Sequence, residues 1–189
     1  MTQPQPPLET LINQLNAGDP NNPDAEWQAA IALGDVTPAA ARTRAVEALI
    51  AVMQAGRAHA LTRSHAVESL GRLQAVEAIP ILLNAAENDN YRLVRAYALS
   101  ALGRLATDAA IVERLLQRLP AESFYGARAE AVAAAAAIAL RADDAALRQR
   151  VAGVLRQQRI AEAASAAPGA VRIIAEIDRA LPRLQAPEA

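Results

Sequence analysis

The amino-acid sequence predicts an all-α fold, an α-solenoid built from about five stacked helical hairpins. Three observations predict it. Alanine supplies 49 of the 189 residues and only five residues are aromatic, so the hydrophobic 53% consists largely of small, helix-forming side chains. A short motif recurs at intervals of 32 to 37 residues. Between its copies, apolar residues follow a helical period.

The repeated motif is clearest in two copies, at residues 62–73 (TRSHAVESLGRL) and 94–105 (VRAYALSALGRL), which align without a gap at an offset of 32. A third copy at 127–136 follows at an offset of 33. A weaker fourth copy at 27–34 precedes the first by 37 residues at its Leu-Gly pair. Helix pairs that recur in this way cannot bury their apolar stripes alone, so they are expected to stack on one another.

Glycine stands at the same place in both clear copies, as Gly71 and Gly103. A glycine in mid-helix costs about 1 kcal/mol relative to alanine, so a packing reason is expected. Small residues let neighbouring helices approach toward the lower end of the usual interaxial range of about 8 to 10 Å. We therefore expect both glycines to lie where two helices approach closely.

Each copy of the motif is expected to pair with a second helix of the same apolar period. The expected partner helices are residues 8–16, 38–55, 76–88, 109–119 and 144–158, and a last helix is expected at 171–184. Turn-forming residues separate the helices, as in the segment AGDPNNPD. A single domain is expected at 8–184, with a flexible N-terminal segment at 1–7 and a flexible tail at 185–189.

The side-chain inventory excludes several classes of site. The chain has no cysteine and, because all 19 basic residues are arginine, no lysine. It therefore offers no disulfide, thiolate nucleophile, cysteine metal cluster or Schiff-base lysine of its own. The formal net charge of −1 argues against a general nucleic-acid binder, and no apolar run suits a membrane span. A soluble, cytoplasmic protein without membrane insertion is expected.

The segment 78–105 (AIPILLNAAENDNYRLVRAYALSALGRL) carries the residues by which the chain resembles HEAT-like repeats, and the likeness is strongest over 60–140. In that family an acidic residue six positions before the repeat arginine forms a ladder along the stack. Asp89 stands at this distance before Arg95, and Glu122 before Arg128. Arg57 breaks the pattern before Arg63. The resemblance implies that these arginines connect neighbouring repeats.

Within this superfamily, the segments 89–95 (DNYRLVR) and 124–129 (FYGARA) resemble the helical-repeat phycobilin lyases and related phycobilisome-associated proteins. That resemblance implies a cytoplasmic protein of cyanobacterial type, usually paired with a sister HEAT-repeat subunit. Such a protein attaches an open-chain tetrapyrrole of the phycocyanobilin type to a cysteine of a phycobiliprotein subunit, or removes or isomerises it. The tetrapyrrole is a transferred ligand, so no permanently bound cofactor is implied. The alternative is a non-catalytic scaffold for protein–protein interaction.

Aligned on the repeat, equivalent residues of successive helices form columns. One column, four residues before the repeat arginine, holds His59, Tyr91 and Phe124, and another, two residues after it, holds His65, Tyr97 and Glu130. A helical projection centred on Ala98 places Tyr91 in the core and Tyr97 at its flank. The positions expected to form the open surface of the inner layer are Ala60, Ser64, Glu68, Arg92, Ala96, Ser100, Tyr125, Ala129 and Ala133.

The candidate residues for binding a ligand or partner are Arg92, Tyr97, Tyr125, Arg95 and Arg128. The spacing gives Arg92 no structural partner, so its guanidinium can hold a carboxylate of a bilin or of a partner protein. Tyr97 can contact either the next repeat or a ligand. Arg95 and Arg128 have a second interpretation, the acid–arginine ladder between repeats.

Two other kinds of site receive little support from the sequence. His59 and His65 are six residues apart and therefore on different faces of a helix, so no metal site is expected. Paired carboxylates at Asp143 and Asp144 are explained by capping of the helix that follows. Five arginines gather in one late segment, at positions 141, 148, 150, 156 and 159, as on basic nucleic-acid-binding surfaces. A solvated helix face is the more ordinary interpretation of that charge, and nucleic acid is not an expected partner.

Overall fold

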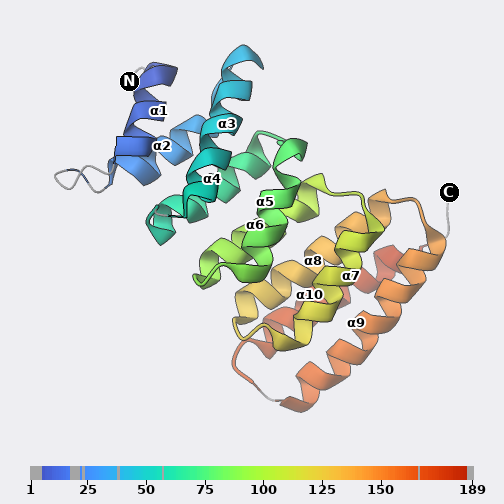
Figure 1. Cartoon of the computed structure of the whole chain (residues 1–189). Coiled ribbons are helices and arrows are strands. Elements are labelled where there is room, and N and C mark those ends of the chain that lie inside the picture. Colours follow the sequence, from blue (N-terminus) through green and yellow to red (C-terminus); the bar gives the residue numbers. More distant parts are fainter. Residues whose placement is uncertain are drawn as a thin grey trace, which may run out of the picture.

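The computed structural model describes residues 6–17, 22, 24–37, 39–56, 58–165 and 167–186. Every regular element in these ranges is helical, which confirms the all-α prediction (Figure 1). The α-helices are α1 (Leu8–Ala17), α2 (Ala25–Leu33), α3 (Ala39–Ala55), α4 (Ala60–Arg72), α5 (Ile79–Asn88), α6 (Arg92–Leu105), α7 (Ala109–Arg118), α8 (Tyr125–Arg141), α9 (Ala145–Ser165) and α10 (Ala170–Gln185). Two 3₁₀ turns, η1 (Val76–Ala78) and η2 (Leu119–Ala121), adjoin α5 and α7.

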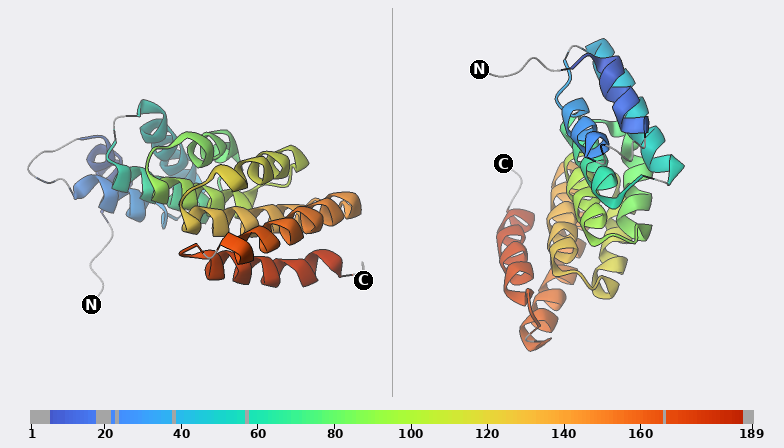
Figure 2. Two further views of the ribbon diagram at one scale, coloured as in Figure 1. Left: turned by 90° about the horizontal axis from the view of Figure 1, so that it is seen from below. Right: turned by 90° about the vertical axis from the view of Figure 1, so that its left-hand side faces the viewer.

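Successive helices pair as hairpins, and the hairpins stack in two layers (Figures 1 and 2). The helices α2, α4, α6, α8 and α10 pack closely on one another in sequence, whereas α3, α5, α7 and α9 touch their layer neighbours only slightly. The layer with the closer spacing must lie on the inside of the stack's curvature. We call α2, α4, α6, α8 and α10 the inner layer, and the structure is the α-solenoid that the sequence predicts.

The glycines of the Leu-Gly pairs explain this close spacing. A Cβ atom built on Gly71 would lie 3.0 Å from the Cβ of Ala101 in α6, and one built on Gly103 would lie 3.0 Å from the Cα of Ala134 in α8. Both contacts are tighter than ordinary van der Waals distances. The predicted packing role of Gly71 and Gly103 is therefore confirmed, since each lets the next inner helix approach its backbone.

One continuous apolar core runs between the two layers. The leucines of the three Leu-Gly pairs, Leu33, Leu70 and Leu102, are completely buried in it. In α8 the core face consists almost entirely of alanines, including Ala135 and Ala139. Because small side chains dominate, the core draws its stability from many close helix contacts rather than from a few bulky residues.

The helix boundaries agree with those expected from the sequence, except at two helices. The predicted helix at 76–88 is divided, because α5 begins at Ile79 with Pro80 in its first turn, and residues 76–78 form the turn η1. The predicted helix at 144–158 runs on to Ser165 as α9. Asp144 accepts a hydrogen bond from the amide of Leu147 at 3.0 Å, as its predicted capping role requires.

The predicted chain ends fall partly outside the described residues. Residues 1–5 of the expected N-terminal segment, residues 187–189 of the expected tail and Pro38 are among those not described, as is Arg57. Gln185, expected in the tail, is the last residue of α10. In the described ranges, no helix combines the length and the apolar character needed to cross a membrane.

Candidate interaction surface on the inner layer

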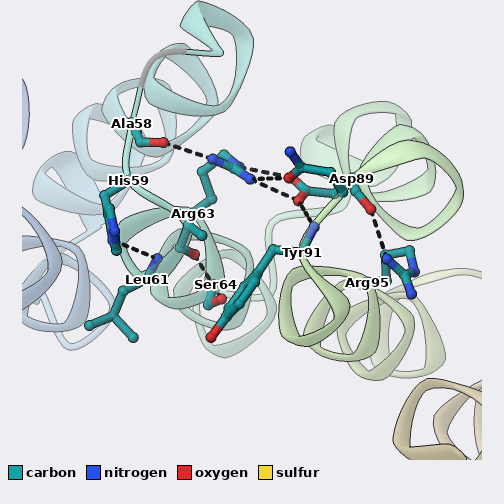
Figure 3. Close-up of polar contacts among 10 residues, drawn as sticks. Ala58, His59, Leu61, Arg63, Ser64, Asp89, Tyr91 and Arg95 are labelled. Atoms are coloured by element: carbon teal, nitrogen blue, oxygen red, sulfur yellow. Dashed lines mark hydrogen bonds and ion pairs between the residues drawn. The ribbon is translucent and has the colours of Figure 1, made fainter. Parts of the chain in front are cut away.

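The repeat arginines form a ladder between neighbouring hairpins, beginning at Arg63 in α4 (Figure 3). Arg63 donates from Nε to Oδ2 and from Nη2 to Oδ1 of Asp89, both at 2.8 Å. Its Nη1 donates to the carbonyl of Ala58 at 2.7 Å. Asp89 also stabilises the turn that leads into α6, because Oδ1 accepts from the amide of Tyr91 at 2.8 Å. This arginine therefore connects two hairpins through one carboxylate.

The second rung repeats the first at Arg95. Arg95 donates from Nε and Nη2 to the two carboxylate oxygens of Glu122, each at 2.7 Å, and Nη1 donates to the carbonyl of Asp89 at 3.0 Å. Glu122 accepts from the amide of Phe124 at 2.8 Å. Each acid thus pairs with the arginine of the preceding repeat, which confirms the ladder that the resemblance implies.

The ladder carboxylates are held in their ionised form. Burial favours the neutral acid, but the hydrogen bonds from Arg63 and from the Tyr91 amide outweigh it, so the pKa of Asp89 lies below its ordinary value. Glu122 behaves alike: burial opposes its charge, and the bonds from Arg95 and the Phe124 amide lower its pKa nonetheless. Both carboxylates are therefore charged at neutral pH.

The third rung of the ladder has an acid that the repeat spacing does not predict. Arg128 pairs with Glu162, which lies inside α9 and is almost completely buried. Gln158 donates to the same carboxylate at 2.6 Å. The sequence between α9 and α10 contains alanine, proline and glycine but no acid, so the last turns of α9 supply the carboxylate instead. No spacing rule based on the earlier copies predicts this pair.

The structure places two candidate residues, Arg95 and Arg128, in this ladder. Their side chains are only 13% and 20% exposed, and each faces a buried carboxylate. They lie beneath the inner surface and hold successive hairpins in register. The other three candidates, Arg92, Tyr97 and Tyr125, lie on or at the edge of that surface.

The predicted open surface of the inner layer is partly wrong. Ser64, Ala96 and Ala129 share one position of the repeat, and all three are buried. The close approach of the inner helices covers this position. Arg92 and Tyr125 are exposed, as expected, at the N-terminal ends of α6 and α8.

The prediction that Tyr91 is a core residue is also wrong, because its side chain is among the exposed large hydrophobic groups. Tyr91 immediately precedes α6 and has an extended backbone, with φ of −96° and ψ of 118°. A helical projection therefore does not apply to it. His59 and Phe124, in the same column, likewise stand just before α4 and α8.

A trough of about 320 Å³ opens on the inner layer across four helices. Its lining includes Ala96, with a single methyl group, and Gly126, which has no side chain, and these small residues leave space. The polar and aromatic residues around it are Glu68 of α4, Tyr97, Ser100 and Arg104 of α6, Phe124 before α8, Glu130 of α8 and Arg172 of α10. We call this feature the inner trough. It includes one of the predicted candidates, Tyr97.

The charged groups of the inner trough differ in whether they have partners. Glu130 lies 3.7 Å from Arg172, and Glu68 lies 3.4 Å from the ring of His65. Arg104 has no carboxylate within ion-pair distance in the described part of the chain. It is exposed, and its guanidinium lies beside Gly71 at the end of α4. Arg104 is therefore a cation available for an external acid.

Aromatic rings gather at the other end of the inner trough. Arg92 stacks over the ring of Phe124 at 5.0 Å, and the rings of Phe124 and Tyr125 are 5.2 Å apart. Tyr125 also packs against Gly169, where an added Cβ would lie 2.4 Å from the ring. Arg92 has no carboxylate partner among the residues described. The sequence pattern identified Phe124 from its column and Tyr125 as an open-surface residue, but it indicated neither Arg104 nor Arg172 as part of this surface.

Two other arginines, Arg72 and Arg141, bind the preceding inner helix in a way that the sequence analysis did not predict. Arg72 donates to the carbonyl of Ile31 near the end of α2 at 2.6 Å, and Arg141 donates to the carbonyls of Gly103 and Ala106 at 2.7 Å. These arginines satisfy carbonyls at the end of the preceding inner helix. Arg72 and Arg104 are the arginines of the Leu-Gly-Arg sequence common to the two clear copies, and that sequence is the signal that could have drawn attention to both.

The late arginines do not form one basic patch. Arg141 binds backbone carbonyls, Arg150 pairs with Glu113, and Arg159 pairs with Asp178 at 2.5 Å. Arg148 is buried and lies 3.7 Å from Asp143. Their charge is therefore used mainly within the fold. No group of three or more metal-ligating side chains occurs in the described ranges.

The comparison with protein families agrees with this architecture. The family described as HEAT repeats matches residues 8–103, from α1 to nearly the end of α6. No curated protein matches the chain significantly. The match covers just over half of the chain and includes the motif copy at 62–73, most of the copy at 94–105, and the first rung of the ladder, Arg63 with Asp89. The chain therefore belongs to the family of HEAT-repeat proteins.

Proposed function

We propose that this HEAT-repeat chain is a protein-interaction module whose docking surface is the inner layer around α6 and α8. HEAT repeats suit protein interaction because stacked hairpins present a long, continuous surface. The observation that supports this location is the gathering of Tyr97, Phe124, Tyr125 and Arg92 beside the inner trough. Tyrosine and arginine are enriched among residues that dominate the energy of protein interfaces.

The arginine–acid ladder supports this function because it fixes the hairpins that carry the docking surface. The bidentate pairs of Arg63 with Asp89 and Arg95 with Glu122 fix adjacent hairpins relative to one another. A surface spread over several helices then has a defined shape before it meets a partner. Such preorganisation reduces the entropy lost on binding.

Site-directed photo-cross-linking in the source cell tests the proposal. A benzoylphenylalanine replaces Tyr125, which is an exposed aromatic of the inner layer, or Glu47, which is exposed on α3 of the outer layer. We expect a discrete cross-linked partner from position 125 and not from position 47. Equal cross-linking from both positions, or cross-linking only from position 47, contradicts the proposed surface.

A more specific function, suggested by the resemblance to phycobilin lyases, is that the module acts on the bilin of a phycobiliprotein. Arginine, tyrosine and phenylalanine side chains around one trough favour this candidate, because guanidinium groups can pair with propionates and rings can stack on a tetrapyrrole. In this case the partner is a phycobiliprotein subunit, a sister HEAT-repeat subunit, or both. The open-chain tetrapyrrole is then the transferred ligand.

Co-expression tests this candidate. The chain is produced with an apo-phycobiliprotein and phycocyanobilin, with and without a candidate sister subunit, and covalent colour is measured on the denatured phycobiliprotein. Attachment, removal or a spectral change that depends on this chain supports the lyase function. If the chromophore is unaffected by the chain, the module is a scaffold without this activity.

A further inference from the structure

We infer that the partner segment bound in the inner trough is acidic and extended, with carboxylates that pair with Arg104 and Arg92 and an apolar side chain against Tyr97 and Phe124. This inference rests on the proposed function and specifies the chemistry of the partner. It depends on three observations: two arginines for which the described residues provide no carboxylate partner, aromatic rings between them, and a trough of limited volume.

The volume of the inner trough restricts the shape of its occupant. About 320 Å³ lies at the lower end of the range of about 300 to 1,000 Å³ that is typical of ligand pockets. A helix with its side chains is about 10 Å across and cannot enter such a space. The side chains of an extended segment can enter it one at a time, while the backbone of that segment stays above the floor.

The positions of the two arginines set the length of the segment. Arg92 and Arg104 lie at opposite ends of α6, which separates them by about 18 Å along the helix axis. Arg92 leans over Phe124 toward α8, whereas Arg104 lies beside Gly71 of α4. A segment that reaches both must cross α6 obliquely. An extended chain covers about 18 Å with five to six residues.

The charges around the inner trough also indicate where acidic residues are disfavoured in the bound segment. Glu130 is already paired with Arg172, and Glu68 lies beside the ring of His65, so a third carboxylate near these two acids would be repelled. Acidic residues are therefore favoured at the two ends of the segment and disfavoured in its middle. An apolar side chain suits the middle, where Tyr97 and Phe124 offer ring surface.

A phage-displayed library of random heptapeptides provides the test. The library is selected against the full chain and, separately, against the Arg104→Glu variant. We expect wild-type selections to enrich peptides with Asp or Glu near the ends and an apolar residue between them. The Arg104→Glu selections should lose the acidic residue at one end. Selection of no peptides, or of peptides without excess acid, overturns the inference.

The enriched peptides are then synthesised and measured by fluorescence anisotropy. Arg104→Gln should weaken binding about tenfold or more, since a charge-assisted hydrogen bond is lost. Arg156→Gln is the matched control, because Arg156 is also exposed but lies on α9 of the outer layer. A peptide with Lys in place of the terminal Glu should regain affinity for Arg104→Glu. Equal effects of Arg104→Gln and Arg156→Gln contradict the proposed contact.

Two outcomes separate this inference from the proposed function. If a partner cross-links to position 125 but its bound segment carries no acidic residues, the inference fails and the interaction module remains. If no partner cross-links to the inner layer, the proposed function fails. Thermal melting of each variant shows whether the fold is intact, and the neutral Arg104→Gln variant keeps the test valid if Arg104→Glu is unstable.

Discussion

At the scale of single residues, the ladder shows how one ion pair serves both stability and shape. Glu122 accepts from two nitrogens of Arg95 and from the amide of Phe124, and its side chain is 6% exposed. A buried pair of this kind contributes little net stability compared with apolar residues, but removal of one partner leaves a buried charge. The ladder residues are therefore sensitive to substitution even though they lie outside the docking surface.

Substitution of Glu122 tests this sensitivity. Glu122→Gln leaves Arg95 without its carboxylate and should lower the free energy of unfolding by about 3 kcal/mol. Glu113 pairs with Arg150 and is more exposed than Glu122, so Glu113→Gln should lower the free energy of unfolding by less than about 1 kcal/mol. Urea denaturation followed by circular dichroism measures both. Equal losses for the two variants would show that burial of the ladder pair has no energetic consequence.

The lowered pKa values of Asp89 and Glu122 predict how stability depends on pH. Above the unfolded-state pKa values of about 3.9 for Asp and 4.3 for Glu, both carboxylates are charged in either state, and the full stabilisation is present. As pH falls below these values, the unfolded chain binds protons first and stability declines toward the lower folded-state pKa values. Urea unfolding between pH 2 and 7 should show this decline, and Glu122→Gln should reduce it. An unchanged pH profile in the variant contradicts the linkage.

At the scale of helices, the glycines of the Leu-Gly pairs control the distance between inner helices. Gly103 meets Ala134 with no space for a Cβ, whereas Gly153 in α9 has nothing within 4 Å of its would-be Cβ. Both are helical residues, Gly103 two residues before the end of α6 and Gly153 well inside α9, so the main difference between them is in packing. This pair of positions therefore separates the two effects.

Alanine at these two positions should have opposite effects. Gly103→Ala inserts a methyl group between α6 and α8 and should destabilise the fold by about 1 to 3 kcal/mol. Gly153→Ala should stabilise it by about 1 kcal/mol, because alanine has the higher helix propensity. Thermal unfolding monitored by circular dichroism measures the shifts. Stabilisation by both substitutions would mean that the close contact at Gly103 can relax without cost.

The sequence predicts the helices and their pairing because these depend on local patterns. The apolar period and the repeat register locate the inner helices, and the Leu-Gly pairs indicate where they approach. The position of Tyr91 was not predictable from a helical projection, because it depends on where α6 begins. The pairing of Arg128 with Glu162 depends on how far α9 extends beside α8, which is a tertiary property.

At the scale of the whole molecule, the repeat register spreads one surface over four successive hairpins. The inner trough takes residues from α4, α6, α8 and α10, which are up to about a hundred positions apart in sequence. Tyr97 was predictable from its column, but Arg172 reaches the trough only because α10 stacks on α8. The last helix, α10, exposes several charged residues, including Arg172, Asp178 and Arg183, as expected of a terminal repeat.

The most direct test of the docking surface is the affinity of the cross-linked partner for Arg92→Ala, measured by isothermal titration calorimetry beside wild type and Arg156→Ala. Arg92 contacts Phe124 on the surface and has no carboxylate partner among the described residues, so its loss should leave the melting temperature nearly unchanged. We expect Kd to rise about tenfold for Arg92→Ala and to stay constant for Arg156→Ala. An unchanged Kd for Arg92→Ala would contradict the assignment of the inner layer as the docking surface.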